Sequence, residues 1–140
     1  MNFWDTSALV ALSAEEAQRP IALRILHADD RMAVWWGSAV EYVAAISRRE
    51  REGRLTTEEA SEHLLRLREL AQVWYEVQPG WRVKVLAQRL LRVHPLRAAD
   101  SLQLAAALVS AEEDPSSMGF VGFDARLNQA ASREGFRILA

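Results

Sequence analysis

The sequence contains no cysteine and a single lysine, and no apolar run approaches the length of a membrane span. The lack of cysteine excludes disulfide bonds and thiolate metal sites. A transmembrane helix needs about 20 apolar residues, and a signal peptide needs a basic stretch that leads into an apolar one. Neither pattern is found, so we expect a cytoplasmic protein without a membrane partner.

Positive charge comes almost entirely from arginine, because Lys84 is the only lysine. A net charge of −2 does not by itself indicate nucleic-acid binding. The guanidinium group suits phosphate oxygens, but we attribute most of these arginines to a genomic bias toward Arg, Ala and Leu. The 140 residues, half of them apolar, suffice for one core, and we expect residues 1–140 to form a single domain.

Short apolar segments alternate with helical segments along the chain. Strands are predicted over 3–4, 32–36, 73–77, 120–123 and 136–139. Helices are predicted over 8–12, 17–28, 38–54, 56–70, 82–92, 96–112 and 124–134. This alternation is typical of an α/β fold with a mainly parallel sheet of four or five strands. The long helical middle of the chain predicts a helical hairpin that protrudes from the sheet.

Two aspartates follow a predicted strand and precede a predicted helix. Asp5 comes after the first strand, and Asp124 comes after the strand over 120–123. Parallel α/β sheets bind ligands outside the carboxyl ends of their strands. Aspartate is also a preferred N-cap residue, and capping is the favoured interpretation when either residue is considered alone.

Two other acids lie about one turn into apolar helices, where capping explains them less well. Asp100 opens the most apolar helix, with Ser101 and Gln103 as possible hydrogen-bond donors and Arg97 as a possible ion-pair partner. Glu41 lies in a helix that follows a buried strand, where the helix dipole also favours an acid. A buried carboxylate without a basic partner should be protonated or bind a cation.

The four acids can converge on one edge of the sheet, although their spacing does not prove it. Hard divalent cations such as Mg²⁺ prefer oxygen ligands. Two such ions about 4 Å apart can activate water and stabilise the leaving oxygen in phosphodiester hydrolysis. Without metal, clustered carboxylates repel one another, so some of their pKa values should rise.

The chain resembles PIN-domain ribonucleases, and most closely the VapC-type toxins of type II toxin–antitoxin pairs. The resemblance is carried by DTSAL (5–9), Glu41, LRAADSLQLA (96–105) and FVGFDARL (120–127). It implies a three-layer α/β/α fold around a parallel sheet and RNA cleavage that depends on Mg²⁺ or Mn²⁺. It also implies a catalytic, metal-binding quartet formed by Asp5, Glu41, Asp100 and Asp124.

Other roles follow from the same resemblance. Thr6 matches a hydroxyl residue that can bond the metal-site carboxylates, although a helix-start hydroxyl explains it equally well. Arg97 is the candidate for holding a substrate phosphate. The family usually has Thr or Ser two residues before the last acid, where this chain has Gly122, so we expect Asp124 to act through water. Asn128 shares a helix face with Asp124 and could reach the site, although a surface role is favoured.

The resemblance also implies a VapB-like antitoxin partner, and we expect a homodimer. Trp35, Trp36, Trp74 and Trp81 are candidates for either interface, although core packing is favoured for each. The alternatives are a housekeeping PIN nuclease of RNA maturation and a PIN-fold binding protein with weakened catalysis. The three histidines show no sign of forming one site, which favours metal-assisted hydrolysis over attack by the RNA 2′-hydroxyl. A phosphoacceptor receiver domain would need a strand-end lysine, and Lys84 lies in a predicted helix.

Overall fold

The computed structural model of the chain describes residues 1–14 and 17–140. Within these residues five short strands form one sheet, in the order β3-β2-β1-β4-β5, and all neighbouring strands are parallel. The strands are β1 (Asn2–Trp4), β2 (Met32–Trp35), β3 (Tyr75–Val77), β4 (Gly119–Val121) and β5 (Arg137–Ile138). The predicted α/β fold with a parallel sheet of four or five strands is confirmed.

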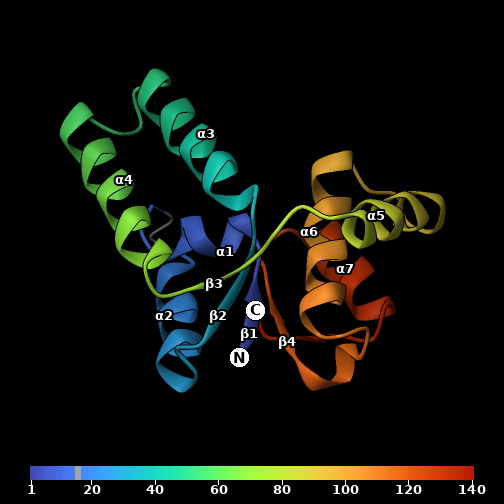
Figure 1. Cartoon of the computed structure of the whole chain (residues 1–140). Coiled ribbons are helices and arrows are strands. Elements are labelled where there is room, and N and C mark those ends of the chain that lie inside the picture. The colour runs from blue at the N-terminus through green and yellow to red at the C-terminus, as the bar shows by residue number, and fades with distance from the viewer. Residues whose placement is uncertain (15–16) are drawn as a thin grey trace.

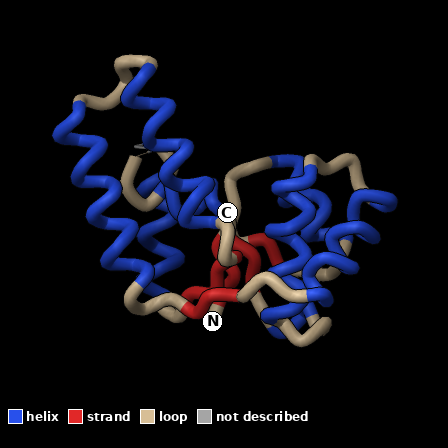
Figure 2. Tube along the Cα trace, turned by 45° about the horizontal axis from the view of Figure 1, so that its top comes forward, coloured by secondary structure: helices blue, strands red, loops and turns tan. Residues whose placement is uncertain are grey.

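Helices cover both faces of this sheet, which forms the middle layer of the molecule (Figures 1 and 2). One side carries α1 (Thr6–Ala11), α2 (Arg19–Ala28), α3 (Ser38–Arg51) and α4 (Thr57–Ala71). The other side carries α5 (Trp81–Val93), α6 (Ala98–Ser110) and α7 (Ala125–Arg133), and the short 3₁₀ turn η1 (Pro115–Ser117) precedes β4. The result is the three-layer α/β/α arrangement that the sequence predicts.

Two apolar cores lie on the two faces of the sheet, because successive residues of a strand point to opposite sides. Phe3 and Phe120 stack on each other and pack against α5, α6 and α7. Their neighbours Trp4 and Val121 face the other way and pack with α1 and the hairpin helices. All four side chains are fully buried, so the strands are anchored from both sides.

The predicted helical hairpin is formed by α3 and α4, which project away from the sheet (Figure 1). Thr56 and Glu59 form the predicted capping box at the start of α4. The buried Tyr42 on α3 donates its hydroxyl to the carbonyl of His63 on α4, with an O···O distance of 3.1 Å. The Tyr42 bond joins the two helices in the half of the hairpin nearer the sheet, whereas the capping box lies at the far end, where the chain turns from α3 into α4.

Some predicted details are wrong. Helix α6 begins at Ala98 rather than Leu96, because Arg97 is extended and serves as the N-cap residue. The sequence predicts Ser38 as the N-cap residue of α3, but Gly37 takes that position, and Ser38 is the first helical residue, fully buried. Core packing is correct for Trp35 but wrong for Trp36 and Trp81, which are 49% and 71% exposed.

Among the described residues, no helix combines the length and the apolar character that crossing a bilayer requires.

Candidate active site

The site lies where the order of the strands changes direction. The chain passes from β1 to β2 and β3 on one side, and later returns to place β4 on the other side of β1. Ligands of parallel α/β sheets bind outside the carboxyl ends of the strands at such a point. Asp5 directly follows β1, and its backbone N–H donates to the carbonyl of Val121, the last residue of β4, at 3.0 Å. Asp124 lies three residues after Val121.

Asp5 is both a helix cap and a buried acid. Its Oδ1 accepts hydrogen bonds from the backbone N–H of Ala8 at 2.9 Å and from the Ser7 hydroxyl at 2.7 Å. Ser7 in turn accepts the backbone N–H of Phe123 at 2.8 Å, which ties the cap to the loop before Asp124. The residue is 2% exposed. Capping therefore uses one carboxylate oxygen, and Oδ2 has no hydrogen bond to the described residues that would prevent it from binding a ligand.

Gln103 organises the second group of polar side chains. It is 1% exposed on α6, and its Nε2 lies 2.8 Å from Thr6 Oγ1, 3.0 Å from Ser38 Oγ and 3.0 Å from Glu41 Oε2. One buried amide therefore joins α1, α3 and α6. An amide nitrogen has two hydrogens, so the three acceptors share two donors. The contact holds Glu41 and Thr6 beside each other at the site.

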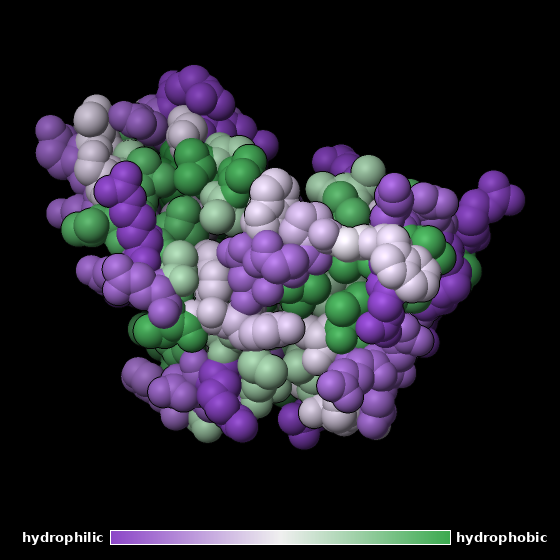
Figure 3. All heavy atoms as spheres, in the orientation of Figure 1, coloured by the Kyte–Doolittle hydropathy of each residue, from purple (hydrophilic) through white to green (hydrophobic). Residues whose placement is uncertain are grey.

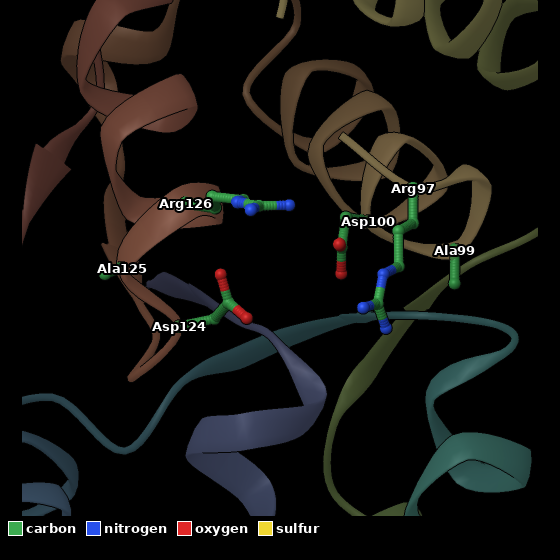
Figure 4. Close-up of a pocket in the computed structure, with 6 residues that line it drawn as sticks. All are labelled: Arg97, Ala99, Asp100, Asp124, Ala125 and Arg126. Atoms are coloured by element: carbon green, nitrogen blue, oxygen red, sulfur yellow. The ribbon is translucent and has the colours of Figure 1, made fainter. Parts of the chain in front are cut away.

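Asp100 and Asp124 face each other across an open cavity of about 480 Å³ (Figure 4). The cavity is lined by residues from the starts of α6 and α7, and each helix contributes one acid and one arginine. Arg97 belongs to the side of Asp100, and Arg126 to the side of Asp124 (Figure 4). The space-filling view shows a hollow between the α3–α4 hairpin and the helices α5 and α6 (Figure 3).

The four acids act on one another electrostatically. The pKa of Asp5 is raised to about 7, chiefly by burial and to a smaller extent by the charges of Asp124 and Glu41, while the two hydrogen bonds to Oδ1 oppose the rise. Burial also raises the pKa of Glu41, helped by the charge of Asp100 and opposed by Gln103 and Thr6. Each acid is thus coupled to two others, as expected for carboxylates that share one site.

Asp100 completes this ring of couplings. Burial is the largest cause of its raised pKa, and the charge of Asp124 adds to the effect. The backbone N–H and the charge of Arg97 oppose the rise, as does the charge of Arg126. Both arginines therefore lower the pKa of Asp100, but they do not remove the repulsion among the acids.

The donor set suits a hard divalent cation in its chemistry. All four predicted ligands offer carboxylate oxygens, which Mg²⁺ and Mn²⁺ prefer. In the described part of the chain, no three acidic or histidine residues stand close enough to enclose an ion by themselves. This fits ions that keep several waters and take only one or two carboxylates directly. Asp5, Glu41, Asp100 and Asp124 are the residues that would hold such an ion.

The structure brings all four predicted acids together, with Thr6 and Arg97, but it assigns some contacts differently. Gln103 bonds Glu41 rather than Asp100, and the Ser101 hydroxyl donates to the carbonyl of Ala98 at 2.7 Å. Both expectations for Asp100 were wrong because α6 turns these side chains toward α1 and α3 or back onto its own backbone.

Two contributors were missed from the sequence, Ser7 and Arg126. Ser7 stands two residues after Asp5, a spacing at which a hydroxyl can bond the capping carboxylate. Arg126 stands two residues after Asp124 in the first turn of α7, where the helix directs it to the cavity. Both could have been found by examining each acid together with the helix that it caps.

The stability of the metal-free protein should fall as pH rises toward 7. The unfolded chain loses the Asp5 proton near pH 4, whereas the folded protein keeps it until about pH 7, so folding is weakened in this window. Asp5→Asn removes the charge and keeps Oδ1 as the capping acceptor. At pH 8 in EDTA we expect this variant to be more stable than the wild type by roughly 2–4 kcal/mol, with little difference at pH 4. Urea unfolding at both pH values measures this, and an equal difference at both would contradict it.

Replacing Gln103 should cost more than replacing its buried neighbour. Gln103→Met keeps the volume but leaves the buried Ser38 hydroxyl and the part-buried Thr6 and Glu41 oxygens without their donor, at a cost of about 1–3 kcal/mol in the free energy of unfolding. Ser101→Ala is the matched control, since its hydroxyl bonds only within α6. Urea unfolding of both variants decides the point, and a Gln103→Met variant no less stable than Ser101→Ala would contradict the role of the amide.

Comparison with known proteins identifies the family of the chain and supports its fold. A model of the PIN domain family matches residues 3–132. Among solved structures, the chain is similar to the crystal structure of PAE2754 from Pyrobaculum aerophilum, with a TM-score of 0.65 and 21% identity. That likeness covers 99% of this chain and 83% of the other, and it concerns the fold. No curated protein matches the chain in sequence. The chain belongs to the PIN domain family, whose members are generally nucleases.

Proposed function

We propose that this protein is an endoribonuclease that hydrolyses RNA phosphodiester bonds with Mg²⁺ or Mn²⁺, and that it is the VapC-type toxin of a toxin–antitoxin pair. One observation carries the proposal: four mutually coupled carboxylates surround the carboxyl ends of β1 and β4, beside an open cavity flanked by two arginines. A cytoplasmic location belongs to the same proposal, because a toxin of this kind acts on cellular RNA.

The arginines give the cavity its affinity for the substrate. Arg97 and Arg126 are both exposed and lie on opposite sides of the cavity (Figure 4). A guanidinium group donates two parallel hydrogen bonds to phosphate oxygens. The two side chains therefore bind the phosphate from opposite sides and hold it next to Asp100 and Asp124. They also offset the repulsion between the phosphate and the acids.

The acids hold the cation and orient the attacking water. When bound, the cation supplies positive charge that activates water and stabilises the leaving oxygen. Asp5 and Glu41 are rigid, because Ser7 and the Ala8 N–H hold one and Gln103 holds the other. Asp124 is the most exposed of the quartet, and its Oδ1 caps α7 by accepting the Leu127 N–H at 2.9 Å. We assign it a contact through water.

The toxin role requires a protein that silences the enzyme. Beside the site, Trp36, Val40 and Val43 at the start of α3 are 49%, 68% and 39% exposed. Neighbouring exposed apolar side chains favour contact with a partner protein. We assign this surface to a VapB-like antitoxin segment or to a second copy of the chain in a homodimer. A housekeeping PIN nuclease would share the chemistry and need no antitoxin.

RNA cleavage should require both the divalent cation and Asp100. We expect the wild type to cleave RNA in Mg²⁺ or Mn²⁺ and to lose activity in EDTA. Asp100→Asn should lower the rate at least ~100-fold, because one oxygen ligand and one charge are lost. Glu62→Gln, an exposed acid on α4, is the matched control and should keep full activity. Cleavage in EDTA, or an active Asp100→Asn protein, would contradict the mechanism.

The same pair of proteins tests the toxin role. Induced expression of the wild type should arrest bacterial growth, whereas Asp100→Asn should not. Growth that continues while the purified wild type cleaves RNA would support the housekeeping alternative instead.

Removing either cavity arginine should weaken substrate binding more than catalysis. Arg97→Ala and Arg126→Ala each lose charge-assisted hydrogen bonds to phosphate, so KM for RNA should rise about tenfold. The dependence of KM on salt should also become shallower, because fewer phosphate contacts remain. Arg68→Ala, an exposed arginine on α4, is the control. An unchanged KM in both cavity variants would remove these arginines from the substrate site.

A further inference from the structure

Gly122 lies against the free oxygen of Asp5. A Cβ atom at this position would stand 2.9 Å from Asp5 Oδ2 and 2.8 Å from Asn128 Oδ1, both closer than real Cβ contacts allow. The φ angle of Gly122 lies outside the left-handed region, unlike those of Gly53 and Gly135. The need for glycine here is therefore one of space and not of backbone conformation.

Asn128 occupies the space that a side chain at position 122 would take. It lies one turn after Asp124 on α7, and its Nδ2 donates to the carbonyl of Gly122 at 2.8 Å. This bond fixes the amide plane. The other end, Oδ1, is buried and has no hydrogen-bond partner among the described residues. Asn128 Oδ1 and Asp5 Oδ2 thus border the same small space.

The contact concerns the oxygen that Asp5 has left for a ligand. Oδ1 of Asp5 is engaged by Ser7 and the Ala8 N–H, so those bonds fix only one end of the carboxylate. A buried amide oxygen is neutral, and it can coordinate a hard cation or accept a hydrogen bond from water. An oxygen of this kind next to Asp5 Oδ2 adds to the site without adding negative charge to the four acids.

We propose that Asn128 is a positioning residue of the acid site. We also propose that a side chain at position 122 could take the place of the Asn128 side chain, so that the site has room for only one of the two. From α7, Asn128 limits the space open to Asp5 Oδ2, and its amide stands where a side chain at position 122 would stand from the loop after β4. The cation-binding part of this inference rests on the proposed function. One consequence is that a hydroxyl at position 122 cannot improve the site while Asn128 is present.

A double-mutant cycle with Asn128→Ala and Gly122→Ser tests the pair. Mn²⁺ affinity is measured by calorimetry on EDTA-treated protein at pH 8, for the wild type, both single variants and the double variant. Each single variant should weaken Mn²⁺ binding about tenfold, one by losing the amide and the other by the collision with Asp5. The double variant should bind within about threefold of the wild type, because the space vacated by Asn128 lets the loop that carries the serine shift away from Asp5 Oδ2. Gln129→Ala, the exposed neighbour on α7, should change nothing.

Urea unfolding of the same four proteins in EDTA measures the effect of each substitution on stability in the absence of metal. The midpoint for the double variant should lie above that for Gly122→Ser, and additive losses in both measurements would overturn the proposal. Recovery of the unfolding midpoint without recovery of Mn²⁺ affinity would assign Asn128 to packing alone and overturn its positioning role. A wild type that binds no Mn²⁺ would contradict the proposed function, and the unfolding cycle alone would then decide whether the two positions exchange.

Discussion

Four carboxylates stay close together at the carboxyl edge of a parallel sheet although like charges repel. The fold meets this constraint by fixing each acid from a different segment. Asp5 is held by the cap of α1, Glu41 by the amide of Gln103, and Asp100 by the first turn of α6. Burial, and to a smaller extent the repulsion that remains, raises the pKa values of these three residues. A site built in this way favours positive charge, either from a cation or from the arginines at its rim.

The arrangement of the strands explains why these particular residues meet. Strands β1 and β4 are neighbours with buried side chains on both faces, so their ends are rigid and lie side by side. Asp5 could be read from the sequence either as a cap or as a ligand, and the structure shows that capping uses Oδ1 alone, so that the two roles do not exclude each other. The cap fixes Oδ1 and thereby orients Oδ2. Stability and function are therefore not separable at this residue, and removing its charge should help folding while harming the site.

Local patterns in the sequence predicted the elements well, because they depend on neighbouring residues. The strand at β1, the capping box of Thr56 and the positions of the four acids at strand ends or helix starts are of this kind. The partner of Gln103 could not be predicted, because it depends on how α6 packs against α1 and α3. The role of Gly122 has the same origin: its missing side chain gains meaning only from Asn128 and Asp5, which contact it in the folded protein. The exposure of Trp36 and Trp81 could not be predicted from composition, because it depends on their places directly after β2 and at the start of α5.

In the proposed mechanism, Asp5, Glu41, Asp100 and Asp124 form one divalent-cation site. The most direct measurement is anomalous diffraction from crystals of the wild-type protein soaked in millimolar Mn²⁺ near pH 8. We expect an anomalous peak among these four side chains, from an ion that contacts one or two of the carboxylates directly. A strong Mn²⁺ peak elsewhere on the protein, with none between the starts of α1, α6 and α7, would contradict it.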